Sequence, residues 1–176
     1  GSASAADLRR GATLVYRHFL SLSNELQTPK IVLCPSDGLG RVEAVNWSTN
    51  RTRGRDAAQY FAGNSSVSYF VGFEADETLP QSLLSGDRNI TNSDRTDISK
   101  GIVFRFRMRA RRNDPPPLPT PEPGWDKNIH DTAGNVALGD GSVQAFSSSK
   151  LRQGIRDMGI QEVQIAVPGD EDERGR

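Results

Sequence analysis

The hydrophobic positions near the start of the chain recur at helical spacing. Between residues 5 and 27, apolar side chains follow one another at steps of three and four: Leu8, Ala12, Val15, Phe19, Leu22 and Leu26. This spacing predicts an amphipathic helix with one buried stripe. Pro29 ends it, because proline lacks the amide hydrogen that a further turn needs. Gly11 weakens the helix by roughly 1 kcal/mol, which the buried stripe is expected to outweigh.

Beyond this helix the pattern changes to short apolar or alternating runs, which are typical of strands. We expect strands in KIVLC (residues 30–34), VEAVNW (42–47) and SVSYFVGF (66–73). GIVFRFRMRARR (101–112) alternates apolar residues with arginines, so one face is expected to meet a core and the other to meet water. EVQIAV (162–167) is predicted to be the last strand.

The remaining segments separate or follow these strands. Residues 113–124, NDPPPLPTPEPG, hold six prolines in twelve residues and are predicted to form an extended loop without ladder hydrogen bonds. Ser148 or Ser149 is expected to cap a helix through KLRQGIRDMG. The charged residues 169–176 have nothing to bury and are predicted to be disordered. Residues 1–4 are interpreted as a cloning remnant or linker, which leaves one domain over residues 5–168.

The segment NIHDTAGNVALGDGSVQAF (128–146) combines a turn sequence with a histidine. Asp140 and Gly141 stand between two alternating runs, which predicts a β-hairpin with a type I′ turn and positive φ at both of its central residues. His130 precedes the pair by ten positions. We interpret it as a structural side chain that forms hydrogen bonds near the hairpin.

Composition narrows the possible functions without selecting one. Lysine plus arginine and aspartate plus glutamate both total 22, so no net field attracts nucleic acid, which is not an expected partner. The single cysteine, Cys34, excludes an internal disulfide and is expected to be a small buried side chain. No apolar run approaches the ~20 residues that span a bilayer.

A catalytic role for His130 is an alternative. A hydrolase would pair this histidine with Asp131 or Asp140 and would recruit a serine as nucleophile. The chain has no Gly-x-Ser-x-Gly elbow, and its many ordinary serines do not single one out. We therefore predict no catalytic residues and no enzyme activity.

The spacing of His130, nine intervening residues and then Asp140-Gly141 is that of the H-X9-DG pattern. This pattern stands near the C-terminus of prepilin-like proteins of the planctomycete and verrucomicrobial type, which are similar to the pseudopilins of type II secretion systems. Cys34, Pro35 and Asp37 lie in VLCPSD, which resembles a second recurring element of these proteins, a strand that ends in Cys-Pro-Ser-Asp. SYFVG and SGDRNIT are similar to their central region, so the resemblance covers roughly residues 30–147.

The resemblance implies an α+β, pilin-like fold in which a long N-terminal helix packs on an antiparallel sheet. The helix would be residues 5–27, the sheet-rich region residues 30–147, and residues 148–168 would add a helix and a strand that many pseudopilins lack. The chain then represents a headpiece whose preceding membrane anchor is not in this sequence.

The function implied is that of a non-enzymatic structural subunit of a secretion pseudopilin or pilin-like assembly. It would be periplasmic or at the cell surface, anchored in the inner membrane, with other pilin-like subunits and secretion-system components as partners. The alternative is a surface module on the same scaffold that recognises an anionic polymer or a glycan.

Two further binding sites are open on sequence grounds. Oxygen-bearing side chains that suit calcium are concentrated within eleven residues: Asp87, Asn89, Asn92, Asp94 and Asp97. Major pseudopilins often hold calcium in a C-terminal loop, but this run lacks the glycine and the closing glutamate of an EF-hand, and closing local turns is the competing role. The arginine row at Arg105, Arg107 and Arg109 could bind anions, or it could be a solvated strand face. No other cofactor is expected.

Overall fold

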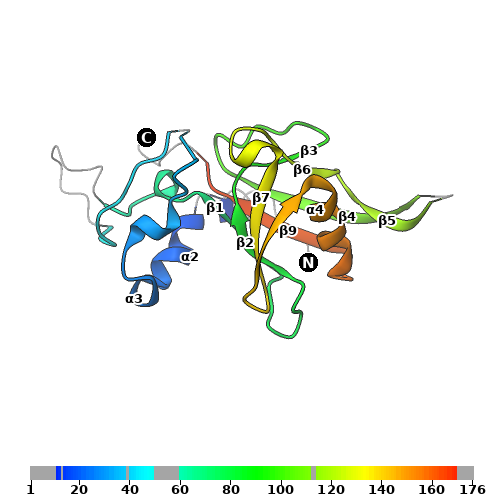
Figure 1. Cartoon of the computed structure of the whole chain (residues 1–176), viewed down its shortest axis with the longest axis horizontal. Helices are drawn as coiled ribbons and strands as arrows, with labels where there is room; N and C mark the ends of the chain where they lie inside the picture. The colour runs from blue at the N-terminus through cyan, green and yellow to red at the C-terminus, as the bar shows by residue number, and fades with distance from the viewer. Residues whose placement is uncertain (1–10, 13, 39, 50–59, 112–113, 170–176) are drawn as a thin grey trace.

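The computed structural model describes residues 11–12, 14–38, 40–49, 60–111 and 114–169. Its centre is a curled antiparallel sheet of seven strands in the order β5-β4-β9-β1-β2-β7-β8 (Figure 1). These strands are β1 (Tyr69–Gly72), β2 (Leu83–Asp87), β4 (Ile102–Arg111), β5 (Asp114–Thr120), β7 (Ala133–Leu138), β8 (Val143–Ser147) and β9 (Glu162–Val167). A separate antiparallel pair joins β3 (Ile90–Asn92) to β6 (Pro123–Trp125).

The helices are short. Those with described bounds are α2 (Val15–Ser21), α3 (Ser23–Leu26) and α4 (Ser148–Asp157), with single 3-10 turns at η1 (Pro29–Val32), η3 (Asn64–Ser66) and η4 (His130–Thr132). Residues 11–12 are helical as well. The cap of α4 is Ser147, one residue earlier than expected, whose hydroxyl accepts a hydrogen bond from the Lys150 amide at 3.2 Å. Among the described residues, no helix has both the length and the apolar character to cross a membrane.

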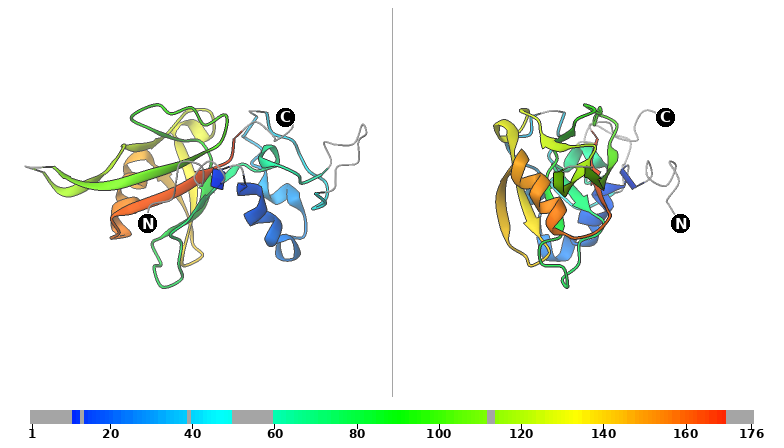
Figure 2. Two further views of the ribbon diagram at one scale, coloured as in Figure 1. Left: turned by 180° about the vertical axis from the view of Figure 1, so that it is seen from behind. Right: turned by 90° about the vertical axis from the view of Figure 1, so that its right-hand side faces the viewer.

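Two apolar cores lie on opposite faces of the sheet. The larger core lies on the concave face of the sheet, which α4 covers (Figure 2). It contains Leu151 and Ile155 of α4 together with strand residues such as Phe104 and Ile165. The smaller core joins α2 and the segment up to Val67 to the other face of the sheet. The period of two in β4 explains this division, because Phe104 and Phe106 face α4 whereas Val103 faces the smaller core.

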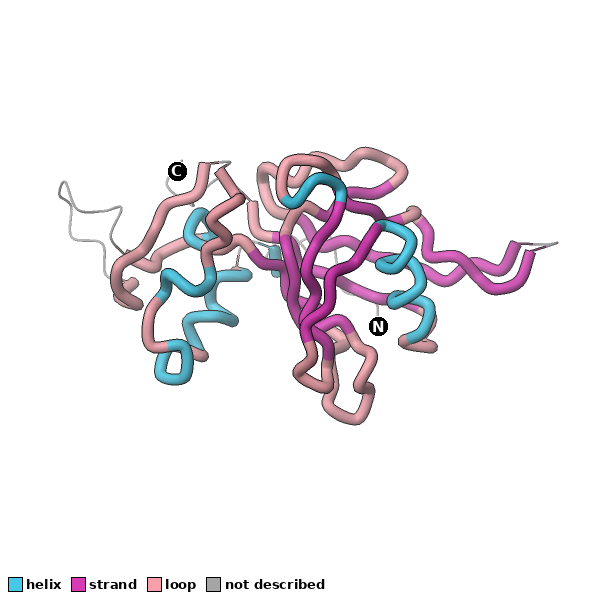
Figure 3. The backbone as a smooth tube through the Cα atoms, viewed as in Figure 1, coloured by secondary structure: helices cyan, strands magenta, loops and turns pink. Residues whose placement is uncertain are grey.

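The expected long N-terminal helix packed on a sheet is wrong. The helical path breaks at Leu14 (φ −111°, ψ 12°) and again at Leu22 (φ −95°, ψ 13°), and α3 ends at Gln27 with φ 61° (Figure 3). These breaks turn the apolar stripe, so Leu26 packs on the smaller core while Leu22 remains 47% exposed. Residues 5–10 of the predicted helix lie outside the described residues.

Two predicted strands are also absent from the part of the chain that the structure describes. KIVLC contributes to η1 instead of a strand, because Pro29 at the first helical position and the Thr28 side chain at the cap favour a helical turn. VEAVNW forms no named strand, and its pairing is one isolated bridge between Asn46 and Tyr60. The prediction missed β2, β3 and β6, which have short or polar sequences.

The proline-rich segment forms a strand, which corrects the expected loop. Met108 of β4 lies opposite Pro119 of β5, and β5 is the edge of the sheet. An edge strand needs hydrogen bonds on one side only, so prolines are tolerated there. The strand β9, expected as an addition at the C-terminus, lies between β4 and β1 and belongs to the middle of the sheet.

The predicted hairpin is confirmed as β7 and β8, but its turn is of another type. Gly141 donates to the carbonyl of Leu138 at 2.9 Å, and Leu138 donates to the carbonyl of Ser142 at 2.9 Å. Gly141 has φ +82°, whereas Asp140 is not among the described residues with positive φ. The loop is therefore a three-residue turn closed by a left-handed glycine, a form that needs positive φ at one position only.

We predict that Gly141→Val lowers the free energy of unfolding by about 1–3 kcal/mol, because valine resists a left-handed backbone. A Cβ atom added at this position would meet no atom within 4 Å, so the expected loss comes mainly from φ. Gly141→Asn is the control, since asparagine tolerates this region and should lose less. Urea unfolding of the three proteins measures the difference, and equal losses for valine and asparagine would contradict the turn assignment.

Candidate functional site

The Cys-Pro-Ser-Asp segment folds as a turn that buries both of its ends. The Asp37 amide donates to the Cys34 carbonyl at 3.0 Å, with Pro35 at the second position, where its restricted φ favours the turn. The side chains of Cys34 and Asp37 are both buried. The turn therefore delivers a thiol and a carboxylate to the interior, three residues apart.

Asp37 is the centre of a buried ionic cluster. Its two carboxylate oxygens accept hydrogen bonds from Arg88 Nε at 2.6 Å and Arg88 Nη2 at 3.0 Å, and Arg41 Nε lies 3.6 Å from Oδ2. The side chains of Arg88 and Asp37 are 2% and 0% exposed. Arg41 in turn donates to the carbonyls of Asn64, Val67 and Gly169. This cluster joins the N-terminal segment to the end of β2 and to the residues after β9.

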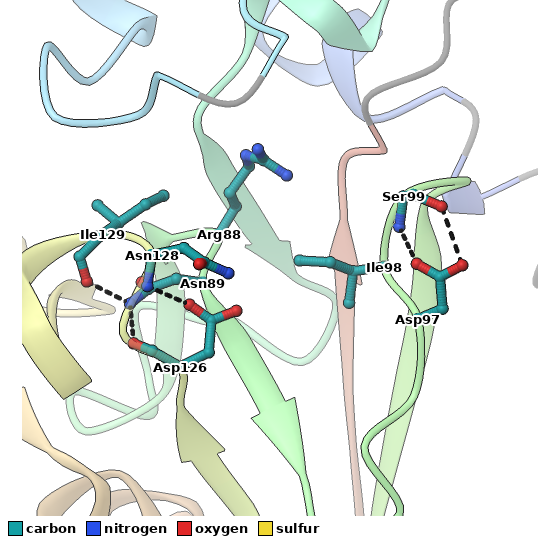
Figure 4. Close-up of a pocket in the computed structure, with 8 residues that line it drawn as sticks. All are labelled: Arg88, Asn89, Asp97, Ile98, Ser99, Asp126, Asn128 and Ile129. Atoms are coloured by element: carbon teal, nitrogen blue, oxygen red, sulfur yellow. Dashed lines mark hydrogen bonds between the residues drawn. The ribbon is translucent and has the colours of Figure 1, made fainter.

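The loop that carries His130 is held by one amide group. Asn89 Nδ2 donates to the carbonyls of Asp126, Ile129 and Ala133 at 3.0, 2.6 and 3.1 Å, and Figure 4 shows the first two of these bonds. His130 has φ 53°, and the next two residues are left-handed as well, with φ 46° and 66°. A left-handed path over three residues that are not glycine is costly, so these contacts are needed to maintain it.

Three potential ligand atoms converge where this loop meets the turn. His130 Nε2 lies 3.4 Å from Cys34 Sγ and 3.5 Å from Asp87 Oδ2, and the ligand atoms of the three residues all lie within 4.8 Å of one another. Asn135 holds the Asp87 carboxylate through its backbone amide at 2.6 Å and its side-chain amide at 3.1 Å. Cys34 and Asp87 are buried, whereas the His130 side chain is 31% exposed. We call this group the Cys34–Asp87–His130 cluster.

Tyr69 lies beside the cluster, opposite Asp87 in the pairing of β1 and β2. Burial, followed by the charges of Cys34, Asp87 and Asp37, raises the pKa of Tyr69 to about 12. The tyrosine therefore keeps its proton at neutral pH.

This geometry differs from that of a nucleophile triad. In such a triad the base contacts the nucleophile with one ring nitrogen, and an acid orients it through the other. Here the thiol and the carboxylate both face Nε2 of His130. Sulfur, nitrogen and oxygen atoms around one point form a ligand set for a metal ion such as zinc.

The structure separates the residues of the H-X9-DG pattern. His130 precedes β7, while Asp140 and Gly141 follow its far end, so the histidine and the aspartate do not form one site. Ser142 forms a hydrogen bond to Asp140 and lowers the pKa of its carboxyl. His130 instead approaches Cys34, 96 residues earlier in the chain, a pairing that no local spacing indicates.

The side chains of the predicted calcium set have separate local contacts. Asp87 and Asn89 make the bonds described above, and Asn92 accepts from the Thr96 amide at 3.2 Å. Ser93 donates to the exposed Asp94 at 3.3 Å. Ser99 bonds to Asp97 through its amide and its hydroxyl, which lowers the pKa of that carboxyl. Each of these contacts closes a turn or joins two segments, and calcium binding stays a prediction.

A cavity of about 180 Å³ lies beside the Asn89 contacts (Figure 4). Its walls are Arg88, Asn89, Asp97, Ile98, Ser99, Asp126, Asn128 and Ile129. The Asp126 and Asp97 carboxylates each accept an amide hydrogen two residues further along the chain. The volume is below the 300 Å³ or so of a typical small-molecule site, so the cavity adds no ligand candidate.

The arginine row follows the face of β4 that points away from α4. Arg107 Nε lies 2.6 Å from a carboxylate oxygen of Glu162, and Arg105 Nε lies 3.8 Å from the other one. Arg109 is exposed. One strand neighbour thus neutralises part of the positive row, and anion binding by Arg105, Arg107 and Arg109 stays a prediction.

Removing one partner of the buried ion pair should destabilise the fold strongly. We expect Arg88→Met to cost about 3–5 kcal/mol in the free energy of unfolding, because it leaves the Asp37 charge with a weaker partner in a dry site. Lys30→Met is the matched control, since the Lys30–Glu43 pair is 57% and 53% exposed and should contribute below about 1 kcal/mol. Denaturant unfolding measures the free energy of unfolding of both variants. Similar losses of this free energy in Arg88→Met and Lys30→Met would contradict the central role of Arg88.

The raised pKa of Tyr69 predicts a loss of stability at high pH. The unfolded chain releases this proton near pH 10 and the folded chain near pH 12, so the contribution is present below about pH 10 and is lost as pH rises through about 12. Tyr69→Phe should flatten the decline of the melting temperature over this window relative to Tyr60→Phe. Parallel declines in the two variants would contradict the electrostatic assignment.

Comparisons with known proteins neither support nor exclude the resemblance to prepilin-like proteins. No protein-family model, no curated protein and no solved structure matches the chain. The likeness to prepilin-like proteins therefore rests on the residues of VLCPSD, the central region and the H-X9-DG pattern. Its functional meaning is argued below as a proposal.

Proposed function

We propose that the chain is a non-enzymatic structural subunit of a cell-envelope assembly, similar in role to the pseudopilins and pilin-like proteins that its motifs resemble. In this proposal it acts outside the inner membrane, where an N-terminal anchor would hold it, and it contacts other subunits through its N-terminal segment. The long helix that the resemblance implied is not part of this proposal, because the structure has the short helices α2 and α3 in its place.

One observation carries the proposal, namely the contact between the two motif elements. Cys34 of VLCPSD meets His130 of the H-X9-DG pattern at 3.4 Å. Beside this contact, Asp37 of the first element binds Arg88 at the end of β2. Cys34, Asp37 and His130, three of the residues that the resemblance singles out, therefore connect the N-terminal segment to the rest of the domain, which supports a structural role.

The N-terminal segment also offers an apolar surface for assembly. Leu22 at the junction of α2 and α3 is exposed, as is Ile31 in η1. A partner subunit that covered these apolar side chains would remove them from water, which is favourable by roughly 25 cal/mol per Å² of buried apolar surface. A subunit that assembles through this end would leave α4, on the other face of the sheet, free of contacts.

Photo-crosslinking in cells that express the complete gene tests this proposal. A photoreactive residue replaces Leu22, and the same residue at the exposed Gln153 of α4 is the control. We expect membrane-associated crosslinks to other envelope subunits from position 22 and few from position 153. Equal crosslinking from both positions would contradict assembly through the N-terminal segment.

The N-terminus of the gene product gives a second, independent outcome. The proposal expects a leader that ends in glycine, followed by an apolar stretch of ~20 residues, the length that spans a bilayer. Sequencing the mature chain identifies the cleavage site. A conventional secretory signal, or a mature chain without an apolar anchor, would overturn the proposal.

A further inference from the structure

We infer that the Cys34–Asp87–His130 cluster is a binding site for a divalent transition metal ion of the zinc class. The site would hold the ion with one thiolate, one imidazole and one carboxylate, and a water or other small ligand would complete its coordination. This inference does not rest on the proposed function, because it follows from the positions of three side chains.

Two of the three distances between the ligand atoms are close to those of a tetrahedral zinc site. Zinc bonds of about 2.3 Å to sulfur and about 2.0 Å to nitrogen and oxygen place the sulfur about 3.5 Å from the nitrogen and the nitrogen about 3.3 Å from the oxygen. The structure has 3.4 Å from Cys34 Sγ to His130 Nε2 and 3.5 Å from Nε2 to Asp87 Oδ2. The sulfur and the carboxylate lie within 4.8 Å, so they need to approach by little more than 1 Å to reach the separation of about 3.5 Å.

Hydrogen bonding accounts for only one of the two contacts of His130 Nε2. The Cys34 sulfur lies 3.4 Å from this nitrogen, which is within hydrogen-bonding distance, and the thiol is able to donate or to accept. A charge-assisted bond between a histidine and a carboxylate is typically about 2.7–2.9 Å long, whereas the contact between Nε2 and Asp87 Oδ2 is 3.5 Å. A cation between the three atoms would contact all of them.

A divalent ion also suits the charges of the ligands. Metal binding removes the proton of the Cys34 thiol, and the resulting thiolate and the Asp87 carboxylate carry two negative charges, which one divalent ion neutralises. The Asp87 carboxylate is buried, and the hydrogen bonds that it accepts from Asn135 come from neutral amides. An ion at the cluster would place positive charge beside this carboxylate.

Contacts around the cluster fix the three ligand side chains in position before an ion binds. Asn135 orients the Asp87 carboxylate, as hydrogen-bonded second neighbours do in known metal sites. Asn89 holds the loop on both sides of His130 through the carbonyls of Ile129 and Ala133. Cys34 is positioned by its turn. The 31% exposure of the His130 side chain provides a path for the ion and room for a water ligand.

The ligand set selects the class of metal. Thiolate and imidazole are ligands that zinc and cobalt accept, whereas calcium and magnesium prefer oxygen. The site therefore differs in metal class from the calcium site that the Asp87–Asp97 run suggests, although both ligand sets contain Asp87. An ion here would bridge the N-terminal segment, the end of β2 and the loop before β7, and would add to the stability of the fold by binding only the native state.

Cobalt(II) titration of the reduced full chain is the test. Cobalt bound to a thiolate produces a charge-transfer band in the near ultraviolet, and Cys34 is the only cysteine, so the band can arise from no other residue. We expect one equivalent to bind, the band to appear, zinc to displace cobalt, and the melting temperature to rise with either metal. No band at millimolar cobalt, together with an unchanged melting temperature, would overturn the inference even if every variant failed to fold.

Variants assign the remaining ligands. Cys34→Ser should abolish the band, and Asp87→Asn and His130→Asn should weaken binding by at least tenfold. His18→Asn is the matched control, because it removes the only other histidine, which lies on the exposed side of α2. Circular dichroism checks that each variant folds. Binding that survives both Asp87→Asn and His130→Asn, or that His18→Asn removes equally, would refute the assigned site.

Discussion

The buried pair of Asp37 and Arg88 is the interaction on which the arrangement of the molecule depends. Arg88 follows β2 directly and is among the largest fully buried side chains, so its charge requires a partner inside the protein. That partner comes from a turn in the N-terminal segment, with Arg41 beside it. The turn that carries Asp37 also carries Cys34, which lies 3.4 Å from His130, and the smaller core packs the N-terminal segment against the sheet.

The two faces of the sheet are stabilised by different kinds of contact. On the concave face, α4 buries apolar side chains against strands from both halves of the sheet, which needs no polar contact of special geometry. On the other face, the N-terminal segment has little regular structure, and its position depends on the arginine, asparagine and aspartate contacts described above. Polar residues are therefore concentrated at the junction, where the candidate site also lies.

Local patterns predicted the elements whose residues are neighbours in sequence. The strands Ile102–Arg111 and Glu162–Val167, the hairpin and α4 are confirmed, because period and turn residues are local signals. The face of Ile102–Arg111 that was expected to meet water is solvated only in part, because Val103 is buried in the smaller core. The turn at Gly141 was assigned to the wrong type, since Asp-Gly occurs in more than one loop form. The long helix was wrong because tertiary packing bends the apolar stripe at Leu14 and Leu22.

The sequence by itself determined which residues could be important, among them Cys34, Asp37, Asp87 and His130, and it determined the alternating faces of the longest strands. Tertiary structure alone decided that Cys34 and Asp87 meet at His130 and that Asp140 lies elsewhere. It also decided that the proline-rich segment pairs at an edge and that the last strand enters the middle of the sheet. The physical reason is that the alternation of side chains along a strand depends on neighbouring residues only. The order of strands in a sheet and the pairing of buried charges instead depend on contacts between residues far apart in the chain.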